Sequence, residues 1–302
     1  TGFEVTLEST NIQNKNFTWS SSFNIAFNKN KILSLNYGQE QMTSYISWDQ
    51  KFRNQIAYVS RVGESAGKMY GFVYDGTYKE EDFNITVNEN GKKTYELKPG
   101  VPKFKDGCQP GDPKYKNIDG SEDNLITDND RTVIGNGHPL HTGGFTNNFV
   151  YKNWDLNIFL QWSYGNDVFN VNRLVMENPG AKKQLNQFAS YKNRWSESNP
   201  TSNIPRVRAV GADEYSSLYV EDGSFLKLKT ISLGYNFDTK TLKRIGLSAA
   251  RVFVSAENIA TITGYSGSDP EVSTRHSVLT PGFDWSAYPR AFNASLGVNV
   301  TF

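Results

Sequence analysis

The chain has few of the residues that cross-link a protein or bind metal. Its 302 residues include one cysteine, Cys108, and three histidines. A single cysteine excludes an internal disulfide and argues against a cysteine-based zinc site. The sequence also contains no nucleophile elbow, phosphate-binding loop or His/Glu metal motif. The acidic run Glu80-Glu81-Asp82 is typical of a solvated face. We therefore expect no enzyme activity.

The chain also lacks an excess of either charge and has no long apolar run. The chain has 32 Lys and Arg against 31 Asp and Glu, a net charge of +1, so it has no basic field that would attract nucleic acid. Hydrophobic residues make up 37% and the mean hydropathy is −0.57. No stretch approaches the ~18 to 20 apolar residues of a membrane helix. A helical membrane protein is excluded, but a membrane β-barrel is not, since half of each barrel strand is polar.

The C-terminal segment carries the strongest structural signal. Side chains in a strand alternate between two faces. Here one face is small or polar, and the other is wholly apolar: Phe292, Ala294, Leu296, Val298, Val300 and Phe302. Such a strand suits an outer-membrane barrel, whose outer face meets lipid and whose inner face meets a wet lumen. A C-terminal aromatic residue also resembles the assembly signal of bacterial outer-membrane proteins.

The same alternation recurs along the chain. In residues 154–164 aliphatic side chains lie mid-face and aromatic ones near both ends, typical of a strand that crosses between two aromatic girdles. The members are Trp154, Leu156, Ile158, Leu160, Trp162 and Tyr164. Residues 16–28 alternate similarly, and Asn147 interrupts an apolar face in residues 143–152. In residues 225–237 the apolar phase shifts between Leu228 and Ile231, which predicts a β-bulge or a strand end above the bilayer.

These patterns predict about nine strands of an all-β transmembrane antiparallel barrel, near residues 2–11, 16–28, 45–59, 68–78, 143–152, 154–164, 225–237, 247–258 and 291–302. With the C-terminus on the periplasmic side, short turns at 14–16, 62–67, 152–153 and 238–246 are periplasmic. Long loops at 29–44, 79–142, 165–224 and 259–290 are then external, the asymmetry expected of such barrels. A single-chain bacterial barrel has an even strand number, and Thr1 follows no signal peptide. We therefore expect residues 1–302 to be the C-terminal portion of a larger barrel.

Segments throughout the chain, in loops and in the late strands, carry motifs of a known family. They are residues 110–135 (PGDPKYKNIDGSEDNLITDNDRTVIG), 142–149 (TGGFTNNF), 162–167 (WSYGND), 194–206 (RWSESNPTSNIPR), 221–229 (EDGSFLKLK), 252–258 (VFVSAEN), 265–272 (YSGSDPEV) and 288–290 (YPR). In this order they resemble the SusC/RagA family of TonB-dependent outer-membrane transporters of Bacteroidetes. The resemblance covers nearly the whole chain, and residues 80–105 match least.

The resemblance implies a 22-stranded barrel with long extracellular loops, an internal plug and an N-terminal extension. Plug and extension are not in this sequence. It also implies import of glycans or peptides across the cell outer membrane, with a SusD-like surface lipoprotein as a lid on the external face. TonB would supply the energy for import by acting on a TonB box, a segment that precedes the plug.

One loop has the spacing of a calcium-binding loop. EF-hand positions 1, 3, 5, 7, 9 and 12 supply oxygen ligands, position 7 through its carbonyl; here they are Asp119, Ser121, Asp123, Leu125, Thr127 and Asp130. Asn124 at position 6 tolerates the left-handed conformation required there, and Ile126 is the apolar anchor. Asp130 replaces the usual Glu, so the predicted affinity is low, in the millimolar range of extracellular sites. The alternative is an acidic turn held by Asx hydrogen bonds.

Two weaker features lie in the loops. His138 and His141 lack a Cys or carboxylate at ligand spacing, so we interpret them as solvent-facing loop residues rather than metal ligands. After Pro179-Gly180, apolar residues recur at helical spacing up to Asn199-Pro200: Leu185, Phe188, Tyr191 and Trp195. This predicted helix either packs on the barrel rim or docks against the lid lipoprotein.

Two other function classes share some of these features. A passive porin or adhesin barrel would have the strands but not the family's loop motifs. A soluble glycan-binding β-protein would have the alternation and the aromatic residues but not the double girdles or the terminal Phe302. Dependence on detergent for solubility distinguishes the soluble class from both barrels.

Overall fold

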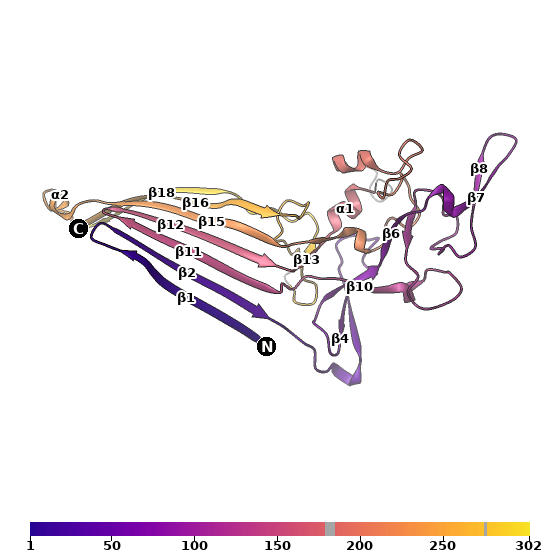
Figure 1. The fold of residues 1–302 in the computed structure, drawn as a ribbon, viewed down its shortest axis with the longest axis horizontal. Helices are drawn as coiled ribbons and strands as arrows, with labels where there is room; N and C mark the ends of the chain where they lie inside the picture. Colours follow the sequence, from indigo (N-terminus) through magenta and orange to yellow (C-terminus); the bar gives the residue numbers. More distant parts are fainter. Residues whose placement is uncertain (179–184, 275–276) are drawn as a thin grey trace.

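A computed structural model describes residues 1–178, 185–274 and 277–302. It consists of a long sheet with a body of loops at one end (Figure 1). Over the described residues, seven antiparallel strands form this sheet, here called the main sheet. In spatial order they are β1 (Gly2–Gln13), β2 (Phe17–Asn28), β11 (His141–Tyr151), β12 (Trp154–Tyr164), β15 (Phe225–Asn236), β16 (Ala249–Thr263) and β18 (Asn293–Thr301).

The connections at one end of the main sheet are all short. The Asn14 side chain accepts hydrogen bonds from the backbone N–H groups of Asn16 and Phe17, at 3.1 and 2.9 Å, and so closes the first turn. Lys152 adopts φ 53° in the two-residue turn between β11 and β12. The third connection holds the short helix α2 (Thr239–Lys243), which the Asp238 side chain caps. We call this the short-turn end, and it also holds the C-terminus (Figure 1).

The opposite, long-loop end carries the loop body, formed by residues 29–140, 165–178, 185–224, 264–274 and 277–292. Its strands form separate small sheets. A four-stranded sheet consists of β3 (Gln41–Tyr45), β4 (Ile56–Arg61), β5 (Lys68–Phe72) and β10 (Arg131–Asn136), and a three-stranded sheet consists of β13 (Asp167–Asn170), β14 (Val220–Asp222) and β17 (Phe283–Asp284). Two-stranded sheets are formed by β6 (Tyr74–Thr77) with β9 (Pro113–Tyr115) and by β7 (Phe83–Val87) with β8 (Lys93–Leu97). Helix α1 (Val171–Met176) follows β13. In the described parts of the chain, no helix is both long and apolar enough to cross a membrane.

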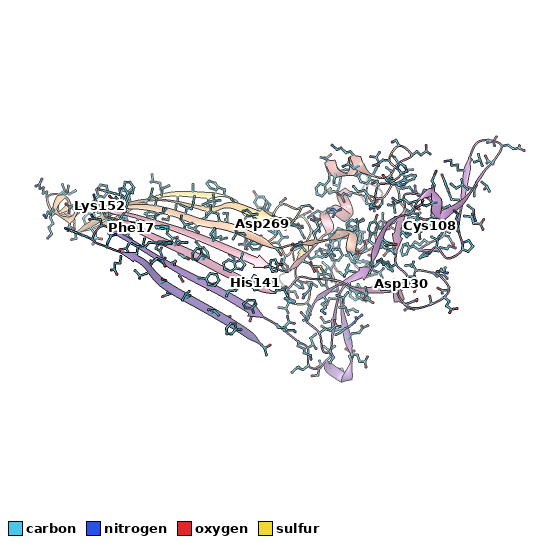
Figure 2. All side chains as sticks on the ribbon, in the orientation of Figure 1. Phe17, Cys108, Asp130, His141, Lys152 and Asp269 are labelled. Atoms are coloured by element: carbon cyan, nitrogen blue, oxygen red, sulfur yellow. The ribbon has the colours of Figure 1, made fainter. Side chains whose placement is uncertain are left out.

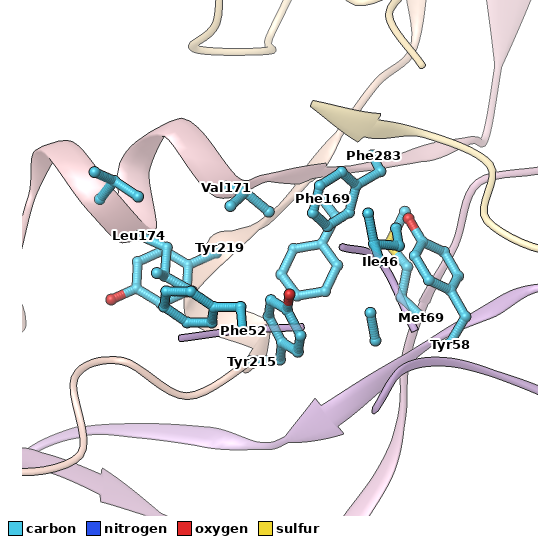
Figure 3. Packing of buried hydrophobic residues seen from close by; sticks show 12 residues of the cluster. Ile46, Phe52, Tyr58, Met69, Phe169, Val171, Leu174, Tyr215, Tyr219 and Phe283 are labelled. Carbon is cyan, nitrogen blue, oxygen red and sulfur yellow. The ribbon is translucent and has the colours of Figure 1, made fainter. Parts of the chain in front are cut away.

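The hydrophobic core lies in the loop body and not in the main sheet. Every residue of β1 is exposed. The largest buried cluster instead gathers side chains from β4, β5, β13, α1 and β17 together with loop residues such as Phe52 and Tyr215 (Figure 3). Trp48 packs against this cluster and donates a hydrogen bond from Nε1 to the Tyr215 hydroxyl at 2.8 Å. The loop body is therefore a folded unit and not a set of independent loops.

The predicted number of nine barrel strands is wrong. Seven of the predicted segments are main-sheet strands within a few residues of the expected bounds, but 45–59 and 68–78 are not. β4 and β5 instead belong to the four-stranded sheet of the loop body, where residues 57–60 are buried one after another. Local alternation could not separate the two cases, because a strand in a folded core is as rich in aromatic and β-branched residues as a barrel strand.

The turn predicted at 62–67 is also at the other end from the one expected. Gly67 packs against the backbone of Val278 and Leu279, inside the loop body. The short turns predicted at 14–16, 152–153 and 238–246 do lie together at the short-turn end (Figure 1). β2 pairs directly with β11, so residues 29–140 form one long excursion.

The register confirms that the apolar faces of all seven strands coincide. Leu7 lies opposite Phe23, and Phe23 lies opposite Phe145. Phe145 lies opposite Leu160, which lies opposite Leu228. Further along, Leu233 lies opposite Val254 and Val254 opposite Leu296. The predicted phase shift in β15 is a bulge: against β12 the register slips between Leu228 and Thr230, which leaves one extra residue, Lys229. The bulge keeps the apolar residues on both sides of it on one face.

Candidate functional site: the polar face and the long-loop end

The polar face of the main sheet carries an ion pair near the short-turn end. Arg251 of β16 reaches across β15 to Asp155 of β12, with Nε–Oδ2 and Nη2–Oδ1 distances of 3.1 and 2.5 Å. Asn236 donates a further hydrogen bond to Asp155 Oδ2 at 2.9 Å. Two N–H donors of the same guanidinium group hold the carboxylate in a fixed orientation. The two charges are about one-third exposed, so the pair orders the face more than it stabilises the fold.

A glycine lets this pair form. Gly234 of β15 lies opposite Asp155 on one side and, on the other, opposite Phe253, which is two residues from Arg251. A Cβ atom there would lie 2.3 Å from Arg251 Nη2 and 2.6 Å from Asp155 Oδ2. Any larger residue would push the ion pair off the sheet.

The apolar face has aromatic residues near both of its ends. Trp154 contacts Tyr235 at the short-turn end, with ring centroids 4.9 Å apart. At the long-loop end His141 lies between Phe27 and Tyr164, at 5.4 and 5.1 Å. Two such bands with aliphatic side chains between them match a hydrocarbon slab with two polar interfaces.

The polar residue Asn147 on this apolar face is satisfied within the sheet. Its side-chain oxygen accepts a hydrogen bond from Trp19 Nε1 at 2.9 Å, and the residue is only 9% exposed. The Trp19 ring also stacks on Phe149, at 5.8 Å. A paired amide costs far less in an apolar environment than a free one.

A buried ionic cluster joins the main sheet to the loop between β16 and β18. Lys227 of β15 is 2% exposed and pairs closely with Glu271, while its Nζ lies 3.6 Å from Asp269. Arg290 pairs with Glu271 at 3.0 Å. Burial favours the neutral form of Asp269, but hydrogen bonds from the Glu271 and Arg290 backbones and the charges of Lys227 and Arg290 lower its pKa. The cluster holds both ends of this loop to the sheet.

Hydrogen bonds close this loop on itself and tie it to the rest of the loop body. The Tyr265 hydroxyl donates to Asp284 Oδ2 at 2.6 Å, and Ser266 donates from its backbone N–H and its hydroxyl to Glu221. Arg173 of α1 pairs with Glu221 at 3.1 Å. Polar contacts therefore join this loop both to the main sheet and to the rest of the loop body.

A cavity of about 480 Å³ lies where this loop approaches the ends of β11, β12 and β15. Thr142, Gln161 and Ser163 line it from the polar face of the strands, and Phe225 and Glu271 line it from the side of the ionic cluster. Hydroxyl and amide groups beside an aromatic ring can bind a polar molecule with an apolar face.

The loop predicted to bind calcium is held by its own carboxylates. Buried Asp130 accepts hydrogen bonds from the backbone N–H groups of Ile118, Asp119 and Thr127 at 2.7, 3.1 and 2.8 Å. Asp119 accepts one from Ser121 N, and Asp123 accepts one each from Ser121 Oγ and Leu125 N. These are the Asx bonds of the alternative interpretation.

Two local expectations for this loop are confirmed. Asn124 is left-handed, with φ 54°. Ile126 is 5% exposed and packs with Phe72 and Tyr115. Among the residues described, no three His, Cys, Asp or Glu side chains are placed to hold a metal ion. Calcium binding through Asp119, Ser121, Asp123, Leu125, Thr127 and Asp130 stays a prediction.

The prediction that both histidines are solvent-facing loop residues is only partly correct: His138 lies in a loop but His141 lies in a strand, and both residues are half-buried. His141 lies in β11, where its Nδ1 accepts a hydrogen bond from Trp162 Nε1 at 3.1 Å. His138 Nε2 lies 2.9 Å from the Ala66 carbonyl oxygen. His141 lies where the main sheet joins the loop body (Figure 2).

The helix predicted after Pro179-Gly180 is not found where the chain is described. Residues 179–184 lie outside the described residues, and the rest forms only a 3₁₀ turn, Ala189–Asn193. Tyr191 is buried, whereas Leu185 and Phe188 are exposed. The following segment folds back, because Trp195 N donates to Ile204 O at 2.8 Å and the Asn199 side chain donates to Asn193 O. The described part of this segment therefore forms short turns instead of the predicted helix.

Sequence reasoning missed the charged residues that organise the site. Three of them, Lys227, Asp155 and Arg251, occupy polar positions of correctly predicted strands. A charged residue at such a position could have been recognised as a candidate for the polar face. Their partners were not predictable, because Glu271 is 44 residues from Lys227 and Arg251 is 96 residues from Asp155.

Comparisons with known proteins agree on one kind of relative. TonB-dependent receptor P3 of Formosa agariphila is 33% identical over 306 residues, covering all of this chain and 28% of the relative. TonB-dependent receptor SusC of Bacteroides thetaiotaomicron is 28% identical over 310 residues, covering all of this chain and 26% of the relative. The structure of the RagAB peptide transporter superposes with a TM-score of 0.73 at 22% identity. The superposition covers all of this chain and 29% of the transporter chain. No model of a known family matches the chain.

Proposed function

Because this chain belongs to the SusC/RagA family of TonB-dependent receptors and spans just over a quarter of the length of the relatives it matches, we propose that residues 1–302 form the C-terminal portion of the barrel of an outer-membrane importer. The main sheet is the lipid-embedded wall. Its apolar face meets acyl chains, and its polar face lines the lumen. The long-loop end is external and the short-turn end periplasmic, the usual asymmetry of bacterial barrels.

The observation that carries this proposal is the continuity of the two faces over seven strands. A soluble sheet would bury its apolar face against a second layer. Here the apolar side chains of β1 and β18 remain exposed, with Leu7 at 62% and Leu296 at 78%. The aromatic bands at the two ends of β12 and its neighbours fit a lipid slab and have no evident role in water.

We propose that import is active and that cargo enters through the long-loop end, under a SusD-like lipoprotein lid. The hairpin of β7 and β8 reaches farthest from the main sheet (Figure 1). Near its tip Val87 is 62% exposed, so the hairpin is a natural point of contact for a lid. TonB would act through the plug, which is outside this sequence. Glycans and peptides are the two cargo classes to test, and the cavity beside Gln161 and Phe225 is the candidate cargo contact.

Uptake by cells that carry or lack the full-length protein tests this function. Labelled glycan and peptide mixtures should enter cells with the protein and not those without it. Collapse of the proton gradient should abolish that uptake, because TonB draws on the gradient. Uptake that persists without the gradient would support a passive porin, and a protein that stays in aqueous solution without detergent would support a soluble β-protein.

Isolation of the native complex in mild detergent tests the lid. A surface lipoprotein should co-purify with the full-length protein, and shortening the β7–β8 hairpin by residues 88–92 should weaken that association. An equal shortening of the turn at 239–243, at the short-turn end, is the matched control. If both deletions have the same effect, the hairpin is not the contact.

A further inference from the structure

We propose that a pocket at the long-loop end binds the phosphate of an anionic glycolipid headgroup in the outer leaflet; this rests on the outer-membrane placement proposed above. The pocket has a volume of about 560 Å³ and lies between the end of β2, the turn before β5 and the segment that leads into β11. We call it the interface pocket. The lining residues used here are Phe27, Lys29, Lys31, Glu64, Lys68 and Leu140.

The depth of the interface pocket matches the headgroup layer. Phe27 belongs to the aromatic band of the apolar face, where it contacts His141 at 5.4 Å. Lys29 is two residues further along the chain, and its backbone is fixed by a 2.9 Å hydrogen bond from its N–H to the Thr1 carbonyl. Aromatic girdles mark the boundary between hydrocarbon and headgroups. The lysines therefore stand immediately outside the hydrocarbon, where lipid phosphates lie.

The charge of the interface pocket selects an anion. It contains three lysines and one carboxylate, and Glu64 is already engaged by Lys68, at 3.1 Å. Neither Lys29 nor Lys31 has an ion pair among those found over the described residues. His138 lines the pocket but is engaged with Ala66 O. Two ammonium groups thus remain for a ligand.

The apolar part of the lining selects a lipid over a free ion. Leu140 is 62% exposed and Phe27 is 42% exposed, and both border the pocket. Lysine side chains can lay their apolar stems along such a surface while the ammonium groups meet a phosphate. A glycolipid presents phosphate, sugar and acyl chain in that order toward the membrane, which fits ammonium groups above and apolar side chains below.

Titration of the full-length protein, in nanodiscs of neutral lipid, with phosphorylated glycolipid tests the proposal. Each lysine near an anionic membrane surface is worth about fivefold in affinity. The double variant Lys29→Gln, Lys31→Gln should therefore bind about 25-fold more weakly. The control variant Lys15→Gln, Lys152→Gln, altered at the short-turn end, should bind as the unmodified protein does.

Three results would overturn the proposal. They are unchanged affinity in the Lys29 and Lys31 variant, equal binding of the dephosphorylated glycolipid, and full displacement of the lipid by millimolar inorganic phosphate, which would make the pocket a site for free phosphate. Retention of the folded barrel is checked by its heat-dependent mobility in gels. Uptake by the same variants is measured separately, so that failure of transport and failure of lipid binding are distinguishable.

Discussion

Replacement of Ile158 by Arg tests the orientation of the main sheet directly. Ile158 is four residues from Trp154 and four from Trp162 on the apolar face of β12. At about 3.3 Å per residue each tryptophan is about 13 Å away along the strand, or roughly 10 Å in depth for a tilt of ~40°. Ile158 therefore lies near the middle of an apolar band about 25 Å tall. Its neighbours in the register are Asn147 and Ile231.

An arginine at this depth should destabilise the barrel by about 2–4 kcal/mol. Since 1.4 kcal/mol is tenfold in an equilibrium constant, the equilibrium constant for folding should fall about 30- to 700-fold. The assay is urea-dependent folding of the full-length protein into lipid vesicles.

The matched control is Asn157→Arg, one residue away on the polar face. The Asn157 amide donates to Asn148 Oδ1 at 2.7 Å, so this change removes one hydrogen bond but leaves the new charge in the lumen. Its cost should stay near 1 kcal/mol. Equal destabilisation by the two substitutions, or a larger cost at Asn157, would refute the assignment of the faces.

The other predictions concern the loops and the polar face. Asp130→Ala removes the acceptor of three backbone N–H groups and should lower the local stability of residues 118–130 by about 2–4 kcal/mol, against about 1 kcal/mol for Asp119→Ala, as read by hydrogen exchange. Millimolar calcium should raise the exchange protection of the same loop if the calcium prediction holds, and unchanged protection contradicts it. Gly234→Val should cost about 1–3 kcal/mol by displacing the ion pair, whereas Ser232→Val on the same face should be nearly neutral in thermal unfolding. Burial raises the pKa of the Cys108 thiol, so its alkylation at pH 8 should be more than about tenfold slower in the native protein than in urea; equal rates would contradict the buried position.

The sequence alone determined the strands of the main sheet and their two faces. Alternation is a local property, so Trp154 to Tyr164 and Phe292 to Phe302 revealed their apolar faces without knowledge of their partners. The break in period between Leu228 and Ile231 was visible for the same reason; it predicted either a bulge or a strand end, and the structure shows a bulge at Lys229. The left-handed Asn124 followed from the few residue types that adopt that conformation.

Only the tertiary structure decided which strands share a sheet and which charges meet. Residues 45–59 and 68–78 alternate enough to suggest barrel strands, yet the loop body buries β4 and β5 in its own core. Pairing between distant segments is set by the whole chain, since each strand takes the neighbour that completes its hydrogen bonds and covers its apolar side chains. The same holds for Lys227, whose burial is tolerated only because Glu271 arrives from a loop 44 residues later. Period and composition act within a few residues, whereas sheet membership and charge pairing depend on contacts that no local pattern encodes.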